Sequence, residues 1–275
     1  IEYILERSRE LRRPVAICIA LGSNFGSHDE FSIFAEYLSS VANLIGVCLC
    51  VAAGNESQAR HHLQGVISSA GEIQNIDIKV GENAGDVFMS LWTDVADRVS
   101  VSVRSPTGEL VGRIPAISGL SVRSDLILER SSLVVSYFFP IEGTGGQLTA
   151  IKIIDATPGV WTITVYGDII LNGIFHCWLP MTGFVDPSVE FLAANPYFTV
   201  TVPSTMLGHY LRCVQHAAGQ PLLTVLLGTY PHGEHRPRFC GAGRGGGGIL
   251  PLRLRLDGRY QCGGRYNYRR RCADA

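Results

Sequence analysis

The sequence has no hydrophobic run long enough to cross a membrane as a helix. Its longest apolar runs, Pro14 to Gly22 and Leu44 to Gly54, are each about ten residues, whereas a spanning helix needs about 20. Charged residues are also scarce, at 17% of the chain, but 46% of the residues are hydrophobic, which excludes an intrinsically disordered chain. These values predict a folded protein without a membrane partner.

A translation start and a leader are missing as well. The chain opens at Ile1, and Glu, Arg and Ser follow within the first ten residues, in place of the basic and then apolar pattern of a signal peptide. We therefore expect a segment of the protein to precede Ile1. The sequence assigns no compartment.

Charge and cysteine both divide near residue 206. Residues 1–205 carry 12 basic and 21 acidic residues, a net charge of −9, whereas residues 206–275 carry 11 and 3, a net charge of +8. Such a basic tail usually predicts an acidic partner. The first four cysteines lie in apolar or aromatic surroundings, which indicates buried thiols without disulfides. They are Cys18, Cys48, Cys50 and Cys177.

The first 65 residues have the pattern of a βαβ unit. Residues 1–13 end a helix before Pro14, Val15 to Leu21 is a buried strand, and Val47 to Ala53 is a second one. Apolar residues between Phe31 and Ile45 recur at helical spacing. The pattern predicts an α/β fold with a parallel sheet, and it places Gly22 and Gly54 at the carboxyl ends of neighbouring strands.

The central part of the chain instead has short alternating segments separated by turns. This rhythm predicts an antiparallel β-sandwich inserted in the α/β domain. Tyr197 to Val202 is then expected to be a strand of the first domain. The predicted domains are 1–65 and 186–205 for the α/β part, 66–185 for the sandwich, and 206–275 for a tail. The expected sandwich strands are 86–91, 98–104, 133–139, 147–154, 160–166 and 174–179.

One string at the end of the second strand carries a side chain that could take part in catalysis. In Val51 to Glu56 a buried strand ends in a turn that holds Asn55, and an amide there could donate a hydrogen bond to a substrate carbonyl. Taken alone, a Gly-Asn pair at a strand end is ordinarily only a turn. The string, however, resembles the Ala-Ala-Gly-Asn-Glu pattern of subtilisin-like serine peptidases, the subtilases.

Further strings in the same order extend this resemblance to residues 14–205. Ile19 to Gly22 is similar to the subtilase strand that ends in Ser-Leu-Gly, with Ala20 in place of the usual Ser. Ser105 to Glu109 and Pro158 to Ile163 resemble a jelly-roll sandwich that certain bacterial subtilases insert in their catalytic domain.

The resemblance implies a serine endopeptidase that cleaves a peptide or protein substrate by Ser-His-Asp acyl transfer. It implies that Asn55 is an oxyanion donor, and it implies no cofactor and no metal. The residues implied to line the substrate cleft are Ala20, Leu21, Gly22, Ala52, Ala53 and Gly54. The catalytic Asp and His would belong to the segment before residue 1, which would then contact this chain.

The triad itself is missing from the sequence. Neither an Asp-Thr-Gly nor a His-Gly-Thr motif occurs, and no Gly-Thr-Ser-Ala loop follows Thr205. When the last two bases of each codon are read with the first base of the next, Arg259 to Gly263 permits Gly-Thr-Ser-Val. In the same frame, Arg238 to Gly246 permits Asp-Phe-Val-Ala-Pro-Gly-Val and His209 to His216 permits Ile-Thr-Cys-Gly-Ala-Tyr-Asn. Our hypothesis is that residues 206–275 are an out-of-frame translation, which would pack poorly.

Other interpretations of the tail are less favoured. A zinc site would use residues whose spacing is long and irregular, and Gly243 to Gly248 lacks the Lys-Ser/Thr ending of a phosphate loop. A nucleic-acid-binding tail is open to the objection that GC-rich DNA read out of frame also produces arginine and glycine. The candidate zinc ligands are Cys213, His216, His232, His235 and Cys240. The candidate nucleic-acid contacts are Arg265, Tyr266, Tyr268, Arg269, Arg270 and Arg271.

Earlier in the chain, His61 and His62 are interpreted as a surface pair, with a base that faces the cleft as the alternative for one of them. His28 with Asp29 is interpreted as a helix cap. Three tryptophans, Trp92, Trp161 and Trp178, are interpreted as core aromatics, with a sugar-binding platform as the alternative. The sequence thus predicts an inactive fragment of a serine endopeptidase. The alternatives are a non-catalytic pseudopeptidase or a β-sandwich binding protein.

Overall fold

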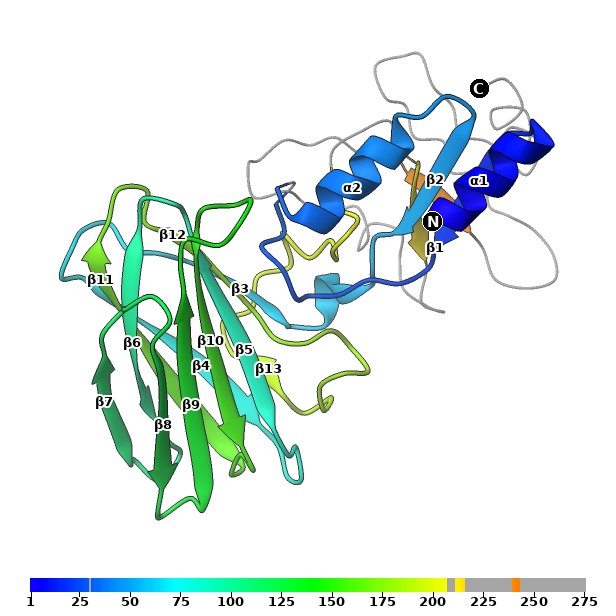
Figure 1. Ribbon diagram of the computed structural model, residues 1–275. Coiled ribbons are helices and arrows are strands. Elements are labelled where there is room, and N and C mark those ends of the chain that lie inside the picture. Colours follow the sequence, from blue (N-terminus) through cyan, green and yellow to red (C-terminus); the bar gives the residue numbers. More distant parts are fainter. Residues whose placement is uncertain (30, 207–210, 216–238, 243–275) are drawn as a thin grey trace. The chain divides into compact units, whose positions relative to one another are not determined.

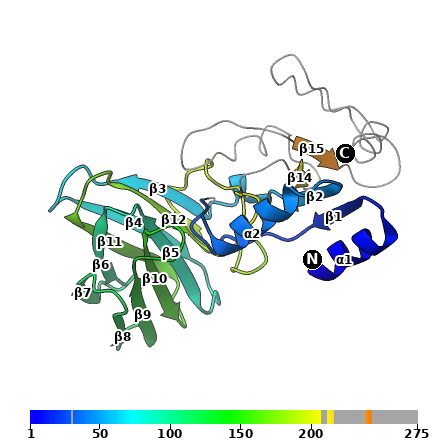
Figure 2. The same ribbon diagram turned by 45° about the horizontal axis from the view of Figure 1, so that its top comes forward.

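The computed structural model describes residues 1–29, 31–206, 211–215 and 239–242. The chain divides into two compact units (Figure 1 and Figure 2). Unit 1 is Ile1–Asn55 with Phe198–Ala275, and unit 2 is Glu56–Tyr197. Most of the predicted tail, including the place where the resemblance puts the nucleophile, lies outside the described residues.

Unit 1 contains the predicted βαβ unit, and the four strands in its described residues are all parallel, in the order β1-β2-β14-β15. Ser32 caps α2, because its side-chain oxygen accepts a hydrogen bond from Ala35 N. None of the described helices is both long and apolar enough to cross a membrane. The elements are α1 (Glu2–Leu11), β1 (Val15–Ile19), α2 (Ile33–Ala42), β2 (Val47–Ala52), β14 (Leu211–Gln215) and β15 (Phe239–Ala242).

Unit 2 is a sandwich of two antiparallel sheets (Figure 1). One sheet has the order β3-β12-β5-β10-β9-β8 and the other has the order β13-β4-β11-β6-β7. The elements are η1 (Glu56–Gln58), β3 (His62–Val66), β4 (Ile73–Val80), β5 (Val87–Thr93), β6 (Arg98–Arg104), β7 (Leu110–Ile114), β8 (Ser121–Leu126), β9 (Ser131–Phe138), β10 (Gln147–Ile154), β11 (Gly159–Ile169), β12 (Ile174–Trp178) and β13 (Glu190–Phe191).

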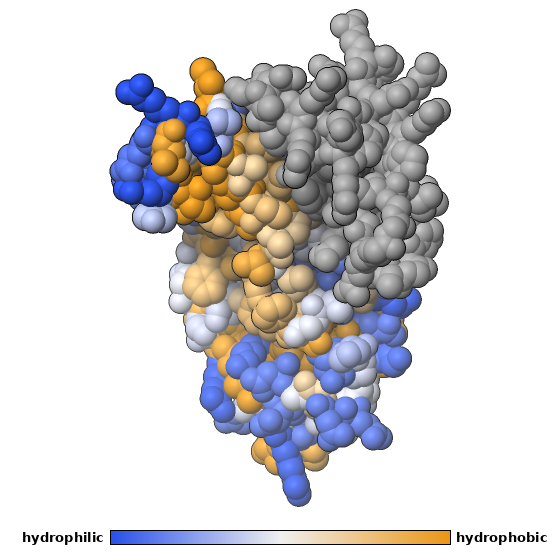
Figure 3. All heavy atoms as spheres, turned by 90° about the vertical axis from the view of Figure 1, so that its right-hand side faces the viewer, coloured by the Kyte–Doolittle hydropathy of each residue, from blue (hydrophilic) through white to orange (hydrophobic). Residues whose placement is uncertain are grey.

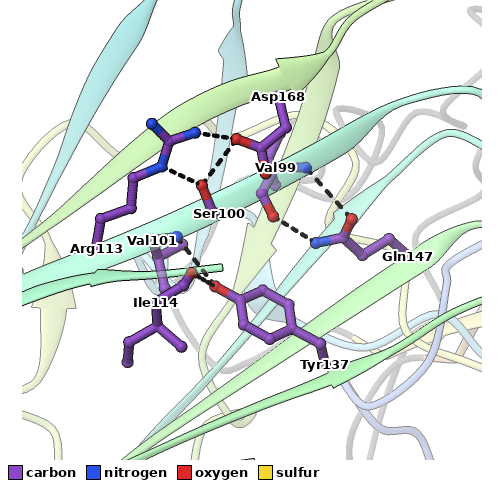
Figure 4. Close-up of polar contacts among 8 residues, drawn as sticks. All are labelled: Val99, Ser100, Val101, Arg113, Ile114, Tyr137, Gln147 and Asp168. Atoms are coloured by element: carbon purple, nitrogen blue, oxygen red, sulfur yellow. Dashed lines mark hydrogen bonds and ion pairs between the residues drawn. The ribbon is translucent and has the colours of Figure 1, made fainter. Parts of the chain in front are cut away.

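Alternating side chains build the core between these two sheets. In β11, for example, Trp161, Ile163 and Val165 are fully buried while the residues between them are not. Polar side chains also cross the core (Figure 4). Gln147 on β10 bonds both backbone groups of Val99 on β6, at 2.7 and 3.3 Å. Such bonds satisfy backbone groups that would otherwise be buried without partners.

The expected fold class, an α/β protein with a subtilisin-like parallel sheet, is wrong for this chain. Strands account for 42% of the described residues and helices for 11%, and only one small sheet among them is parallel. The prediction took the βαβ part as the defining domain and the antiparallel sandwich as an insertion in it, whereas most strands of the described residues pair antiparallel. The two units are divided at residues 55/56 and 197/198, because β3 and β13 pair within the sandwich sheets.

Candidate functional site

The predicted cleft residues lie at the carboxyl ends of β1 and β2. The two strands pair in parallel with Ile19 opposite Val51, so the segments that follow them are neighbours. Ala20, Leu21 and Gly22 follow β1, whereas Ala52 ends β2 and Ala53 and Gly54 come next. The structure therefore brings the two predicted halves of the cleft together at one edge of the unit 1 sheet.

A third segment, which contains Thr201 and Val202, joins these two strand ends. Thr201 N donates to Ala53 O at 3.0 Å, and Ser23 and Val202 exchange two backbone hydrogen bonds of 2.9 Å each. The predicted strand from Tyr197 to Val202 is wrong, because this segment makes only an isolated bridge, from Val202 to Ser23. It nevertheless bonds to both strand ends, which fixes their spacing.

The side chain of Thr201 explains why glycine stands at both strand ends. A Cβ atom on Gly22 would lie 2.2 Å from Thr201 Oγ1, and one on Gly54 would lie 2.5 Å from Thr201 Cγ2. Gly54 also has a φ of +82°, which side chains rarely tolerate. The sequence alone suggests that this glycine lets a substrate approach, but the position of its missing side chain is filled by Thr201.

Three predicted site residues, Ala20, Leu21 and Asn55, are exposed. Leu21 is 77% exposed and Asn55 is exposed, while Ala53 is buried. Figure 3 shows apolar surface, coloured orange, on the upper part of the face that it draws. An exposed aliphatic side chain and an exposed amide at neighbouring strand ends form an arrangement that can bind a peptide through both apolar and polar contacts.

The chain directly after Asn55 is anchored by a buried pair of ionisable residues. His61 Nδ1 lies 2.7 Å from Glu56 Oε2, and Thr182 N donates to Glu56 Oε1 at 3.1 Å. Burial alone would raise the pKa of Glu56, but the hydrogen bonds from His61 and Thr182 and the charge of His61 lower it below its usual value. A carboxylate only accepts, so the proton of His61 is on Nδ1.

The interpretation of His61 and His62 as a surface pair is wrong, because both are buried. His62 Nε2 lies 3.0 Å from His176 Nδ1, and its Nδ1 lies 3.2 Å from Asn195 O. The ring centroids of the two histidines are 5.3 Å apart. This equals the 3.0 Å between the two nitrogen atoms plus the distance from nitrogen to ring centre in each of the two rings. The rings therefore meet edge to edge in a linear N–H···N bond, beside Trp178.

His28 does not cap α2 but lies buried between two backbone carbonyls. Its Nδ1 is 2.9 Å from Val200 O and its Nε2 is 3.0 Å from Asn24 O. Burial lowers the pKa of His28 to about 4, although both carbonyls favour the charged ring. His28 thus links the segment after β1 to the segment that contains Thr201.

The remaining candidates form no further site within the described residues. Trp161 and Trp178 are buried on different sheets, so with the half-buried Trp92 they form no exposed sugar platform. Cys18 is exposed, in contrast to the expectation of a buried thiol, whereas Cys50 and Cys177 are buried. Within the described ranges, no three His, Cys, Asp or Glu residues gather in a way that could hold a metal. The three histidines of the candidate zinc site lie outside those ranges.

The fold is similar to that of a protease. A solved structure, the CspB protease of Clostridium perfringens, matches the chain with a TM-score of 0.69 and 25% sequence identity. The match covers 89% of this chain and 48% of that one, so the chain spans about half the length of this protease. No protein-family model matches the sequence, and no curated protein matches it.

Proposed function

We propose that the chain is the cleft-bearing part of a subtilisin-like serine endopeptidase, in which an extended peptide lies against the ends of β1 and β2. The observation that carries the proposal is the meeting of three segments at these strand ends, where Thr201 closes on Gly22 and Gly54. Likeness to a protease over 89% of the chain supports it. The peptide would add to the segments as a strand, through backbone hydrogen bonds.

In this proposal Asn55 acts on the transition state. Attack of a serine on the scissile carbonyl puts negative charge on its oxygen, and the side-chain NH₂ of Asn55 donates a hydrogen bond to that oxygen. Removal of such a donor costs about 3 kcal/mol of transition-state stabilisation, a value measured on subtilisin itself. The exposed position of Asn55, directly after the positive-φ turn at Gly54, fits a side chain that meets a ligand.

The chain itself is proposed to bind peptides without cleaving them, since the triad motifs are missing from its sequence. Fluorescein-labelled casein is a suitable unfolded probe. We expect casein to raise its fluorescence anisotropy with the purified chain and to stay intact, and we expect a fluorophosphonate to leave the chain unlabelled. Cleavage or labelling would contradict the inactivity, and absence of binding would contradict the peptide cleft.

A matched pair of variants separates this cleft from binding by the sandwich. Leu21 is 77% exposed beside the strand ends, and Leu171 is 82% exposed on the loop between β11 and β12, so neither side chain supports the core. Leu21→Asp should weaken casein binding at least about fivefold because it puts a charge in the apolar cleft. Leu171→Asp should leave the binding unchanged. The reverse result would favour a β-sandwich binding protein.

A further inference from the structure

Two cysteines stand directly opposite each other on neighbouring strands of unit 1. Strands β1 and β2 pair in parallel, and in this register Cys18 is the partner of Cys50. Ile17, Leu49 and Val51 belong to the hydrophobic core of the unit, and side chains alternate between the two faces of a strand. Cys18 and Cys50 therefore project together from the other face of the sheet. Both are thiols in this structure.

The spacing of the two strands suits a disulfide between this pair. Neighbouring strands lie about 4.8 Å apart, which is within the range of about 4.4 to 6.8 Å that separates the Cα atoms of disulfides. The Cβ atoms of facing residues in a parallel pair keep nearly the same spacing, whereas a disulfide prefers about 3.8 Å. The bond can thus form when the strands approach slightly, and its strain makes it easy to reduce again.

Cys48 lies on the same face, but the same geometry excludes it as a partner. The residue opposite Cys48 is Ala16. Cys48 is displaced from Cys18 by two residues along the strands, which puts their Cα atoms about 8 Å apart, beyond the reach of a disulfide of about 7 Å. Along β2 the parallel side chains of Cys48 and Cys50 are about 6.6 Å apart, which is also too far. Of the three cysteines on β1 and β2, Cys18 and Cys50 alone are placed to bond.

The two thiols of this pair differ in their access to solvent. Cys18 is exposed, whereas Cys50 is only 1% exposed. A dissolved oxidant can therefore reach Cys18 first. Redox-active cysteines often combine an accessible thiol with a neighbouring thiol that resolves the first product. The difference in burial thus sets the order in which the two cysteines react.

We propose that Cys18 and Cys50 are a redox-active dithiol that reacts with a low-molecular-weight disulfide such as glutathione disulfide. The Cys18 thiolate attacks one sulfur of glutathione disulfide, the S–S bond of that molecule breaks, and one glutathione thiolate leaves. The Cys50 thiolate then attacks Sγ of Cys18 and releases the second glutathione thiolate. Two protein thiols are oxidised, one glutathione disulfide is reduced to two glutathione molecules, and the two thiol protons pass to the released thiolates.

The new bond would join β1 to β2 two residues before Ala20 and Ala52, so oxidation would tie the two strand ends together. The inference does not depend on the proposed function, because no peptide takes part in the reaction.

The test places the purified 275-residue chain in glutathione buffers that range from fully reduced to fully oxidised. The reaction is quenched with acid, remaining thiols are blocked with N-ethylmaleimide in denaturant, and the digested chain is analysed by mass spectrometry without reduction. We expect one cross-linked peptide pair, with Cys18 and Cys50, and we expect reduced glutathione to regenerate both thiols. The absence of a link at every ratio, a link from Cys18 to another cysteine, or a link that persists in reduced glutathione overturns the inference.

Three variants assign the two roles. In Cys50→Ala the mixed disulfide of Cys18 with glutathione should accumulate at least about tenfold above its level in the native chain, where the neighbouring thiol reacts as an intramolecular group. In Cys18→Ser the buried Cys50 should stay reduced at all ratios. Cys48→Ser is the matched control on the same face and should behave as the native chain does. Equal levels of mixed disulfide in the native chain and in Cys50→Ala would contradict the resolving role of Cys50.

The test stays decisive if one variant fails to fold. Cys18 is exposed, so Cys18→Ser should unfold at the same temperature as the native chain when followed by circular dichroism. If Cys50→Ala does not fold, Cys18→Ser decides alone. A Cys50 that is oxidised without Cys18 would overturn the inference, and a Cys50 that stays reduced would support it.

Discussion

Tyr137 reaches across the sandwich core to the backbone of Val101. Its hydroxyl accepts a hydrogen bond from Val101 N at 3.0 Å and donates one to Ile114 O at 2.8 Å (Figure 4). The pairing of β6 with β7 shifts register between Val101 and Val103. The tyrosine hydroxyl bonds backbone groups of both strands at this irregularity. One side chain of β9 thus ties two strands of the opposite sheet.

Tyr137→Phe is therefore expected to lower the free energy of unfolding by about 2 kcal/mol, because it leaves a buried N–H and a buried carbonyl without a partner. Urea unfolding followed by tryptophan fluorescence measures this loss. Tyr166→Phe is the control, since that hydroxyl contacts Ser102 Oγ, at 3.1 Å, on the outer face. Its cost should stay below about 1 kcal/mol. Equal losses in both variants would refute the special role of Tyr137.

Gly22→Ala should destabilise the chain through Thr201 alone. The added Cβ would lie 2.2 Å from Thr201 Oγ1, and such overpacking costs about 1 to 3 kcal/mol. In a Thr201→Gly background the same substitution should cost at least about 1 kcal/mol less, which a double-mutant cycle by thermal unfolding measures. Gly112→Ala is the control, because nothing lies within 4 Å of its Cβ position. Additive effects would show that the contact is not decisive.

His28 should make stability depend on pH. Its pKa falls from 6.5 to about 4 on folding, so between these values the unfolded chain binds more protons than the folded one. Stability is then full above about pH 6.5 and decreases as the pH falls to about 4, by about 3 kcal/mol in total. His28→Gln should flatten this slope, as measured by urea unfolding at several pH values. An equally steep slope in the variant would assign the pH dependence to other groups.

Asp97 is expected to be a main support of one sandwich end. Its carboxylate accepts hydrogen bonds from the backbone N–H groups of Leu171, Asn172 and Gly173, at 2.6, 3.0 and 2.7 Å. Asp97→Ala should cost about 3 kcal/mol, and Asp97→Asn somewhat less, because an amide oxygen still accepts. Limited proteolysis should then cut first between residues 169 and 173. Resistance of this loop in Asp97→Ala would contradict the assignment.

Continuous apolar runs and clear alternation made part of this fold predictable. β1 and β2 are apolar runs of strand length, and all six predicted sandwich strands are present with ends that differ by a few residues at most. β7 and β8 were among the strands missed, because glycine and charged residues obscure their alternation. The fold class was wrong because the βαβ part was taken as the defining domain and the sandwich as an insertion, whereas most of the described strands belong to the sandwich.

The site could be predicted only where it is local in sequence. Gly22 and Gly54 stand out as strand-end glycines, but Thr201 is far along the chain, and only the folded structure shows that its side chain requires them. His61 was misjudged because histidine is often found at least partly exposed. The sequence did contain an indication of a buried pair, since Glu56 stands five residues before His61. A carboxylate and an imidazole at that spacing meet, however, only when the turn between them brings the two side chains together.

The contacts between the entry segment of unit 2, residues 56–62, and its exit segment, residues 176–195, also bear on how the sandwich could be inserted into such a protein or removed from it. Because Arg60 and His62 touch residues 190–195, unit 2 leaves the chain almost where it entered. A module with adjoining ends behaves as a cassette: its excision would leave a gap that a short linker can close. Recombination at these two points could therefore exchange the whole sandwich in a single event while leaving the segments beside β1 and β2 untouched.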